Sequence, residues 1–286
     1  MLNSIQPTSV GGNLNRRHFL KLAALAGLAA QTGCAAFNGS APPGSAKKGI
    51  GMSTKKAGWE ARLQSLRAQW LYSWTASKPD MFPAGVEFTP MVWGYKGKDS
   101  FAHDLANAKG TGSRNLLGFN EPDQAKQGNL TVEAVLEQWP TLMETGLRLG
   151  SPGCVHPDKQ WMIDFMSRAD ALKYRVDFVC VHSYGGPNVA ALVKRLTQVH
   201  ERFGRPLWIT EFAVGDWKAS SVETNQHSAA TVLSFMEECL PALDELKFLE
   251  RYAWFPAATT SAPLGTSALF NPDNSLTTLG ELYAAH

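Results

Sequence analysis

Short apolar runs alternate with helical periods along most of the chain. From residue 48 onward, eight segments rich in apolar or small residues predict β-strands that are buried on both faces. They cover residues 48–52, 70–74, 88–93, 115–120, 147–152, 176–184, 207–212 and 251–255.

Amphipathic periods predict helices in most of the connections. These helices are expected at residues 59–69, 131–146, 158–174, 188–203 and 222–240. Thr131 is a candidate N-cap, Gly204 a candidate helix end, and Pro241 a helix stop. The connection between the third and fourth strands is expected to be short. Residues 268–271 and 277–285 predict a closing turn and helix.

Strands that alternate with helices predict βαβ units around a parallel sheet. Eight strands in about 240 residues match one (β/α)8 TIM barrel. The alternative is a doubly wound open sheet, but no Gly-x-Gly-x-x-Gly or Walker loop follows a strand. We therefore expect an α/β protein with a single (β/α)8 domain at residues 48–286.

The first 47 residues have a different character. Arg16-Arg17-His18-Phe19-Leu20-Lys21 precedes an apolar run at 22–30 that is too short to span a bilayer. This pattern predicts an export signal at 1–34 and resembles a twin-arginine signal; an ordinary secretory signal is the alternative.

Thr32-Gly33-Cys34 resembles the end of a lipoprotein processing box, which makes Cys34 a candidate lipid anchor. Residues 35–47 are expected to form a flexible linker. We expect a protein exported to the periplasm or the extracellular space, with Cys34 as its only membrane attachment.

The excess of basic over acidic residues lies in this leader. The chain has 27 Lys+Arg and 25 Asp+Glu, but its first 46 residues contain three basic and no acidic residues. The remainder is nearly neutral, which argues against a nucleic-acid partner. An aromatic content of 10% suggests stacking on an uncharged ligand, although most aromatic residues belong in a core.

The three cysteines after the leader predict neither a disulfide framework nor a metal site. Cys154, Cys180 and Cys239 are odd in number and lack a Cys-x-x-Cys spacing. We expect buried free thiols.

Two glutamates stand out by position. Glu121 and Glu211 each end an otherwise uncharged strand, the fourth and the seventh, where a buried carboxylate requires an explanation. The carboxyl ends of barrel strands line the active-site mouth. Two facing carboxyls suit glycoside hydrolysis, with retention at a separation of about 5–5.5 Å and inversion at about 6.5–9.5 Å. A loop ion pair is the alternative for either residue alone.

An ordered set of motifs resembles glycoside hydrolase family 128. The set comprises Leu117-Gly118-Phe119-Asn120-Glu121-Pro122-Asp123, Ser151-Pro152, Val176-Asp177-Phe178, His182-Ser183-Tyr184-Gly185, Trp208-Ile209-Thr210-Glu211-Phe212, Arg251-Tyr252-Ala253-Trp254-Phe255, and Leu269-Phe270 with Leu276-Thr277-Thr278-Leu279-Gly280. The resemblance covers nearly all of residues 48–286.

The resemblance implies a retaining endo-β-1,3-glucanase whose partner is β-1,3-glucan. It implies that Glu121 is the general acid/base, that Glu211 is the nucleophile and that Asn120 binds the sugar 2-hydroxyl. It implies no metal and no organic cofactor. We expect a monomer.

Other residues are candidates for substrate binding. Trp74, Trp93 and Trp254 end strands and are expected to stack on glucose, with core packing as the alternative. His182 and Tyr184 share one face of the sixth strand, where they orient Glu211 or bind a hydroxyl; a core histidine is the alternative.

Three other functions remain open at this point. They are a barrel that binds glucan without cleaving it, an exo-acting or oligosaccharide-trimming enzyme, and a metal-dependent hydrolase that uses His182, His156 and a glutamate. Tyr95 and Trp217, in loops beyond strand ends, are weaker candidates for the cleft.

Overall fold

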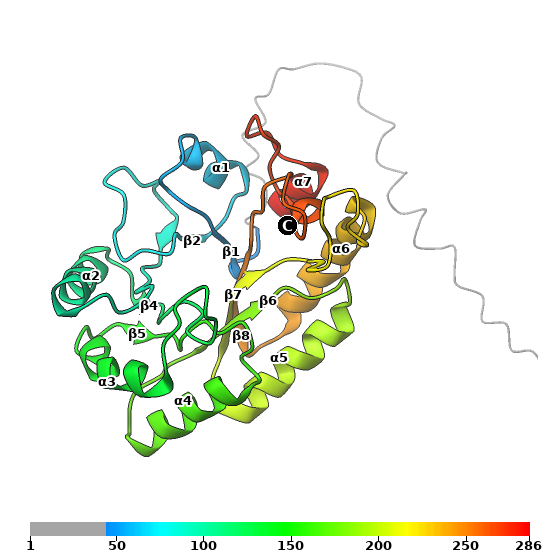
Figure 1. Cartoon of the computed structure of the whole chain (residues 1–286). Helices are drawn as coiled ribbons and strands as arrows, with labels where there is room; N and C mark the ends of the chain where they lie inside the picture. The colour runs from blue at the N-terminus through cyan, green and yellow to red at the C-terminus, as the bar shows by residue number, and fades with distance from the viewer. Residues whose placement is uncertain (1–43) are drawn as a thin grey trace, which may run out of the picture. The chain divides into compact units, whose positions relative to one another are not determined.

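The computed structural model describes residues 44–286 and contains eight strands, with a helix between each consecutive pair except β2 and β3 (Figure 1). The predicted export signal, Cys34 and most of the linker lie outside the described residues. The strands are β1 (Lys48–Gly51), β2 (Trp70–Tyr72), β3 (Glu87–Phe88), β4 (Asn115–Leu116), β5 (Arg148–Leu149), β6 (Val179–Ser183), β7 (Leu207–Phe212) and β8 (Leu249–Trp254).

All named strand pairs are parallel. Six strands form a sheet in the order β3-β2-β1-β8-β7-β6, and β4 pairs with β5. Isolated parallel bridges join Met91 to Leu117, next to β3 and β4, and Gly150 to Phe178, next to β5 and β6. The predicted α/β class with a mostly parallel sheet is confirmed.

The helices occupy the connections. They are α1 (Trp59–Ser65), α2 (Lys98–Gly110), α3 (Val132–Met143), α4 (Gln160–Ala171), α5 (Val189–Phe203), α6 (Ala229–Glu245) and α7 (Thr278–Ala285). Two predicted helix ends are confirmed. The Thr131 side chain accepts a hydrogen bond from the Ala134 amide, and Gly204 ends α5 in the left-handed conformation.

Two helix predictions were wrong. The connection between β3 and β4 is not short, because it contains α2, whose buried stripe is only Phe101, Leu105 and Ala108. Helix α6 starts at Ala229 and continues through Pro241. Pro241 and Glu237, four residues earlier, are both exposed, so water reaches the carbonyl that loses its amide partner.

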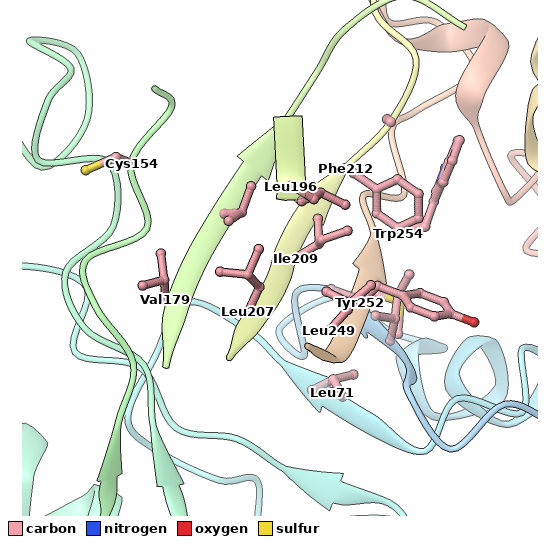
Figure 2. Packing of buried hydrophobic residues seen from close by; sticks show 14 of the residues in the cluster. Leu71, Cys154, Val179, Leu196, Leu207, Ile209, Phe212, Leu249, Tyr252 and Trp254 are labelled. Atoms are coloured by element: carbon pink, nitrogen blue, oxygen red, sulfur yellow. The ribbon is translucent and has the colours of Figure 1, made fainter. Parts of the chain in front are cut away.

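Alternate residues of the strands enter two separate apolar clusters. Leu71, Val179, Leu207 and Ile209 face the helices and pack with residues such as Leu196 of α5 (Figure 2). The opposite face carries a second cluster, which we call the inner cluster: Trp70, Tyr72, Met91, Leu117, Phe178, Cys180, Trp208 and Ala253. The period of two along each strand produces this division.

A charged layer lies where the strands begin. It consists of two ion pairs, Arg148–Glu250 at 3.0 Å and Arg251–Glu87, and we call it the arginine layer. The Arg251 guanidinium lies 4.3 Å from the Trp208 ring centroid.

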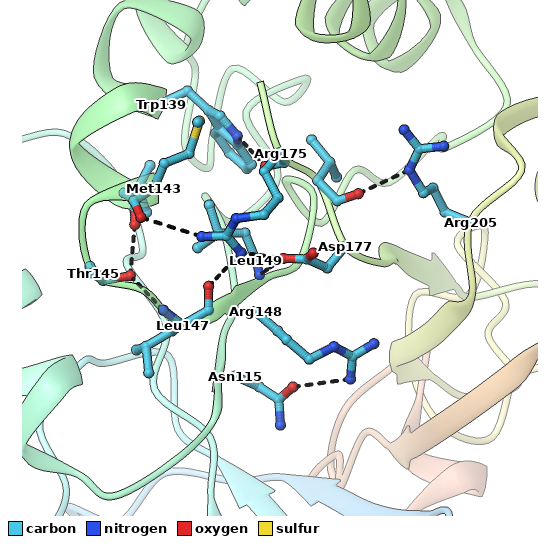
Figure 3. Close-up of polar contacts among 12 residues, drawn as sticks. Asn115, Trp139, Met143, Thr145, Leu147, Arg148, Leu149, Arg175, Asp177 and Arg205 are labelled. Carbon is cyan, nitrogen blue, oxygen red and sulfur yellow. Dashed lines mark hydrogen bonds and ion pairs between the residues drawn. The ribbon is translucent and has the colours of Figure 1, made fainter. Parts of the chain in front are cut away.

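Side chains also satisfy backbone groups at the start of β5 (Figure 3). The Asp177 carboxylate accepts a hydrogen bond from the Leu149 amide at 2.7 Å, and the Arg175 guanidinium donates one to the Leu147 carbonyl at 2.7 Å. Arg148 donates to the side-chain oxygen of Asn115 at 3.4 Å. These hydrogen bonds hold the residues at which the strands begin in place.

Two further predictions concern cysteines and membranes. Cys154, Cys180 and Cys239 are free and buried, as predicted. Within residues 44–286, no helix has the length and apolar character needed to cross a membrane.

Candidate active site

A cavity of about 730 Å³ contains both candidate glutamates in its wall. Six of the eight residues predicted for the site line it: Trp74, Trp93, Asn120, Glu121, Tyr184 and Glu211. They come from segments at or beyond the carboxyl ends of β2, β3, β4, β6 and β7. The structure therefore brings together residues that are as many as 137 positions apart in the chain.

A bulge in β7 directs Glu211 into this cavity. Val181 pairs with Ile209, but the next residue of β6, His182, pairs with Glu211. Thr210 is the extra residue. The side chain of Trp208 enters the inner cluster and that of Ile209 faces the helices. The extra residue returns Glu211 to the inner face, as β-bulges do near active sites.

Glu211 is 5% exposed and accepts three hydrogen bonds from neutral donors. The Tyr72 hydroxyl and the Trp74 indole N–H donate to Oε1 at 2.8 and 2.9 Å, and the Tyr184 hydroxyl donates to Oε2. Burial, together with the charge of Glu211, raises the pKa values of Tyr72 and Tyr184 well above the usual range. Both hydroxyls therefore keep their protons and stabilise an ionised carboxylate.

Glu121 is held by an unusual backbone conformation. Its φ is 41°, in the left-handed region that non-glycine residues rarely adopt. Asn120 bridges to Gly153, and the Glu121 amide donates to the Gly153 carbonyl at 2.8 Å. Strained conformations of this kind are concentrated at functional sites. The local pairing thus fixes the direction of the carboxyl group.

Asn120 is buried next to Glu121. Among the described residues its side-chain oxygen has no hydrogen-bond partner, although the residue lines the cavity. A buried polar atom normally has a partner, so this oxygen suits a polar ligand group.

His182 lies between the two glutamates and is fully buried. Its Nδ1 is 2.9 Å from Glu121 Oε1, and its Nε2 is 3.6 Å from Glu211 Oε1. Burial alone lowers the pKa of His182, but the charge of Glu211 and the hydrogen bond and charge of Glu121 outweigh it and raise the pKa.

One donor atom from each of Glu121, His182 and Glu211 lies within 4.8 Å of the others, close enough to share a metal ion. Hydrogen bonds account for part of this arrangement: both Glu211 oxygens accept hydrogen bonds, and His182 Nδ1 is hydrogen-bonded to Glu121. His182 Nε2 lies 3.6 Å from Glu211 Oε1 and has no hydrogen-bond partner among the described residues. His156, the other histidine of the metal-dependent alternative, lines the cavity but does not join this group.

The prediction for Trp254 was wrong. Trp254 is fully buried among residues facing the helices, where its ring packs edge-on against Phe212 and its indole N–H donates to the Ser267 carbonyl at 2.9 Å (Figure 2). The next residue, Phe255, lines the cavity instead. A difference of one residue along a strand reverses the face.

Of the two aromatic residues that were weaker candidates in loops, one lines the cavity and the other does not. Trp217 is 64% exposed, lines the cavity and donates to the Tyr184 carbonyl at 3.2 Å. Tyr95 packs edge-on against Phe101 and does not line it.

Several residues of the site were not predicted. Tyr72 is fully buried behind Glu211, to which it donates a hydrogen bond. Besides Phe255, the cavity wall includes Gln124, Lys126, Gln127, Val155 and Leu264. Tyr72 could have been found from the sequence, because Trp70, Tyr72 and Trp74 share one face of a strand whose last member was already a candidate.

Comparisons with known proteins agree on one family. The family model described as glycosyl hydrolase catalytic core matches residues 49–283. A solved structure of a GH128 subgroup I endo-β-1,3-glucanase variant from Amycolatopsis mediterranei, in complex with laminarihexaose, is 38% identical. The match covers 84% of this chain and 99% of that chain, with a TM-score of 0.74.

Two other relatives have lower sequence identity to this chain. A GH128 subgroup III curdlan-specific exo-β-1,3-glucanase from Blastomyces gilchristii is 28% identical; the match covers 85% of this chain and 99% of that one, with a TM-score of 0.67. Alkali-sensitive linkage protein 1 of Schizosaccharomyces pombe is 32% identical over 195 residues, which are 64% of this chain and 35% of that protein. The matched region is thus about a third of the length of this curated relative.

Proposed function

Since the chain belongs to the glycosyl hydrolase catalytic core family, and within it to GH128, we propose that it is a retaining endo-β-1,3-glucanase. The observation that carries the proposal is the pair of buried carboxylates, Glu121 and Glu211, in the wall of one cavity. Two such carboxyls are the machinery of glycoside hydrolysis.

The surroundings of each glutamate support separate roles. Glu211 accepts hydrogen bonds from three neutral donors, which stabilise its ionised form without neutralising it, as a nucleophile requires. Glu121 contacts His182, a group able to exchange a proton. We assign Glu211 as the nucleophile and Glu121 as the general acid/base.

The reaction then has two steps. Glu211 attacks the anomeric carbon while Glu121 protonates the departing glycosidic oxygen, which gives a covalent glycosyl-enzyme. Glu121 next takes a proton from water, whose oxygen displaces Glu211. The nearest donor atoms of the two glutamates lie within 4.8 Å, which supports retention, because inversion requires room for a water between carboxyls about 6.5–9.5 Å apart.

The cavity wall suits a neutral sugar polymer. The unpartnered Asn120 oxygen is available to a sugar 2-hydroxyl, and Trp74, Trp93, Trp217 and Phe255 offer aromatic surface for the apolar faces of glucose. Laminarihexaose in the Amycolatopsis structure supports a β-1,3-glucan as the substrate.

We also infer that the strands close into a (β/α)8 barrel within one catalytic domain at 48–286. Pairing of β1 with β8 and the two isolated bridges beside the β4–β5 pair support closure. Strand carboxyl ends then surround the cavity, as in other barrel enzymes.

An exo-acting enzyme is the second candidate, because the Blastomyces relative is one. The test is a panel of β-1,3-, β-1,4- and mixed-linkage glucans and chitin, with product sizing and NMR of the fresh products. We expect β-1,3-oligosaccharides of several lengths that appear first as the β-anomer. Glucose alone would favour exo action, no cleavage would favour glucan binding alone, and an initial α-anomer would contradict retention.

The leader supports a separate proposal about location. Because Arg16 and Arg17 precede a short apolar run, we propose that the full chain is exported. Cell fractionation should find the protein outside the cytoplasm, and replacement of both arginines by lysine should retain it inside. If the wild type and the variant with both arginines replaced by lysine were distributed alike among the cell fractions, a twin-arginine route would be contradicted.

A further inference from the structure

His182 is the buried ionisable group that joins the two glutamates. The ring has no exposed surface, and it reaches Glu121 through Nδ1 and Glu211 through Nε2. Gly153 makes room for it, since a Cβ at that position would lie 2.8 Å from His182 Nε2. The imidazole therefore has one well-defined place in the site.

The charges around His182 are mostly negative. Glu121 and Asp123 approach from the segment after β4, and Glu211 approaches from β7. Arg195 of α5 reaches only the backbone carbonyl of His182, at 3.5 Å. Tyr72, Tyr184 and Cys154 remain neutral, because burial raises the pKa of each well above its usual range.

This arrangement restricts the tautomer of the ring. Nε2 lies 3.6 Å from Glu211 Oε1, beyond hydrogen-bond distance, and has no hydrogen-bond partner among the described residues. Both Glu211 oxygens accept hydrogen bonds from other donors, so neither oxygen carries a hydrogen and the carboxylate near Nε2 is an anion. A lone pair on Nε2 would face that anion and be repelled, so Nε2 carries a hydrogen. Nδ1 then either accepts a proton from the Glu121 carboxyl or carries a proton and donates it to the Glu121 carboxylate. Both arrangements place one proton in the 2.9 Å contact.

We propose that Glu121 and His182 share a single proton, and that His182, held in the Nε2–H form by Glu211, keeps this proton available for the departing glycosidic oxygen. His182 is thus a positioning residue that acts through Glu121. This inference rests on the proposed role of Glu121 as the general acid/base.

Each proton that moves in the two reaction steps has a donor and an acceptor. In the first, the shared proton leaves from Glu121 to the glycosidic oxygen as Glu211 bonds to the anomeric carbon. His182 is then neutral, and its Nδ1 lone pair faces an ionised Glu121, which makes Glu121 a stronger base. In the second, Glu121 takes a proton from water as the water oxygen displaces Glu211, which restores the starting state. His182 keeps its Nε2 hydrogen throughout.

Kinetics on two kinds of substrate test this role. In His182→Gln, kcat/KM on a β-1,3-gluco-oligosaccharide should fall about 100-fold, as for a loss of acid catalysis. The alkaline limb of its pH profile should move down by about one unit, because the amide of glutamine stabilises ionised Glu121. A dinitrophenyl β-laminaribioside needs no protonation of its leaving group, so the loss should be far smaller there.

The Glu121→Ala variant provides the matched background. If His182 acts through Glu121, His182→Gln should lower kcat/KM on the β-1,3-gluco-oligosaccharide far less when it is added to Glu121→Ala than when it is made in the wild type. Equal losses from His182→Gln on both substrates, with an unmoved alkaline limb, would overturn the proposal and place His182 on the Glu211 side.

Nitrogen NMR of the imidazole gives a readout that needs neither activity nor a folded His182 variant. In the wild-type protein, His182 should show a protonated Nε2 at every pH at which the fold persists. In Glu121→Gln the shared proton is absent, so the chemical shift of Nδ1 should differ from that of the wild type. An ordinary histidine titration in both proteins would overturn the shared proton, whereas absence of glucan cleavage with the expected spectra would fault only the proposed function.

Discussion

The two ends of the parallel strands contain glutamates in opposite settings. Where the strands begin, Glu87 and Glu250 pair with Arg251 and Arg148. Where they end, Glu211 accepts hydrogen bonds from two tyrosines and a tryptophan, and Glu121 contacts a histidine. Among residues 44–286, no lysine or arginine forms an ion pair with Glu121 or Glu211.

This difference separates stability from reactivity. A guanidinium fixes the charge of its partner: burial raises the pKa of Glu87, but the hydrogen bond and charge of Arg251 outweigh it and lower the pKa. Neutral donors hold a carboxylate in place while leaving its negative charge available for attack on carbon. The arginine layer thus stabilises the fold, and the cavity end retains carboxylates whose protons and bonds can change.

The largest expected effect is at Glu211. Glu211→Gln keeps the shape of the side chain but removes the nucleophile, so glucan hydrolysis should fall on the order of 10⁴-fold or more while Tm changes little. Glu250→Gln at the opposite end is the matched control and should keep kcat. Comparable losses of glucan hydrolysis in the two variants would contradict the difference in role between the two ends of the strands.

A smaller loss is expected from the donors to Glu211. Tyr184→Phe removes one hydrogen bond to a charged group and should lower kcat/KM about 10- to 100-fold. Tyr252→Phe is the control, because its hydroxyl donates to Asp244, outside the cavity wall. Steady-state kinetics of both variants make the comparison, and unchanged kinetics in Tyr184→Phe would show that this donor does not support the nucleophile.

The arginine layer should respond in stability instead. Arg251→Met leaves Glu87 without its guanidinium and should lower the free energy of unfolding by about 1–2 kcal/mol, a reduced value for a partly exposed pair. Urea unfolding measures the change, and kcat of the folded fraction should stay near that of the wild type. A loss of kcat without a loss of stability would contradict the division of roles.

The smallest effect concerns acid stability. The folded-state pKa of Glu87 is lowered, so its stabilising contribution is complete above its ordinary value of 4.5 and is lost as pH falls through the folded pKa. In Glu87→Gln, the free energy of unfolding should therefore decline less steeply below pH 4.5 than in the wild type. Parallel urea titrations of the two proteins from pH 6 to 3 measure this, and identical slopes would show that Glu87 is not a linked group.

Much of this architecture follows from apolar patterning. The bounds of β7 were predicted as observed, because Pro206 precedes the strand and four of its six residues are apolar, Leu207, Trp208, Ile209 and Phe212. Helix α2 was missed because its three buried residues leave a weak apolar stripe. The length of α6 was misjudged because a proline on an exposed helix face is tolerated.

The site was predictable where a motif places chemistry at a strand end and less so where the fold brings distant residues together. Glu121 and Glu211 stand out in the sequence, and both line one cavity in the structure. The strand face that Tyr72 shares with Trp74 makes it a candidate, but its hydrogen bond to Glu211 joins residues 139 positions apart and depends on the fold. Trp254 was assigned to the cavity because strand pattern alone does not define which face a terminal residue takes; Phe255 lines the cavity instead.

Trapping of the covalent intermediate tests the central claim most directly. Incubation with a 2-deoxy-2-fluoro-β-laminaribiosyl donor that has a good leaving group, followed by peptide mass spectrometry, should find one glycosyl adduct on the peptide that contains Glu211. The Glu211→Gln variant should acquire none. An adduct on Glu121, or rapid turnover of glucan with no adduct and an initial α-anomer, would contradict the double-displacement account.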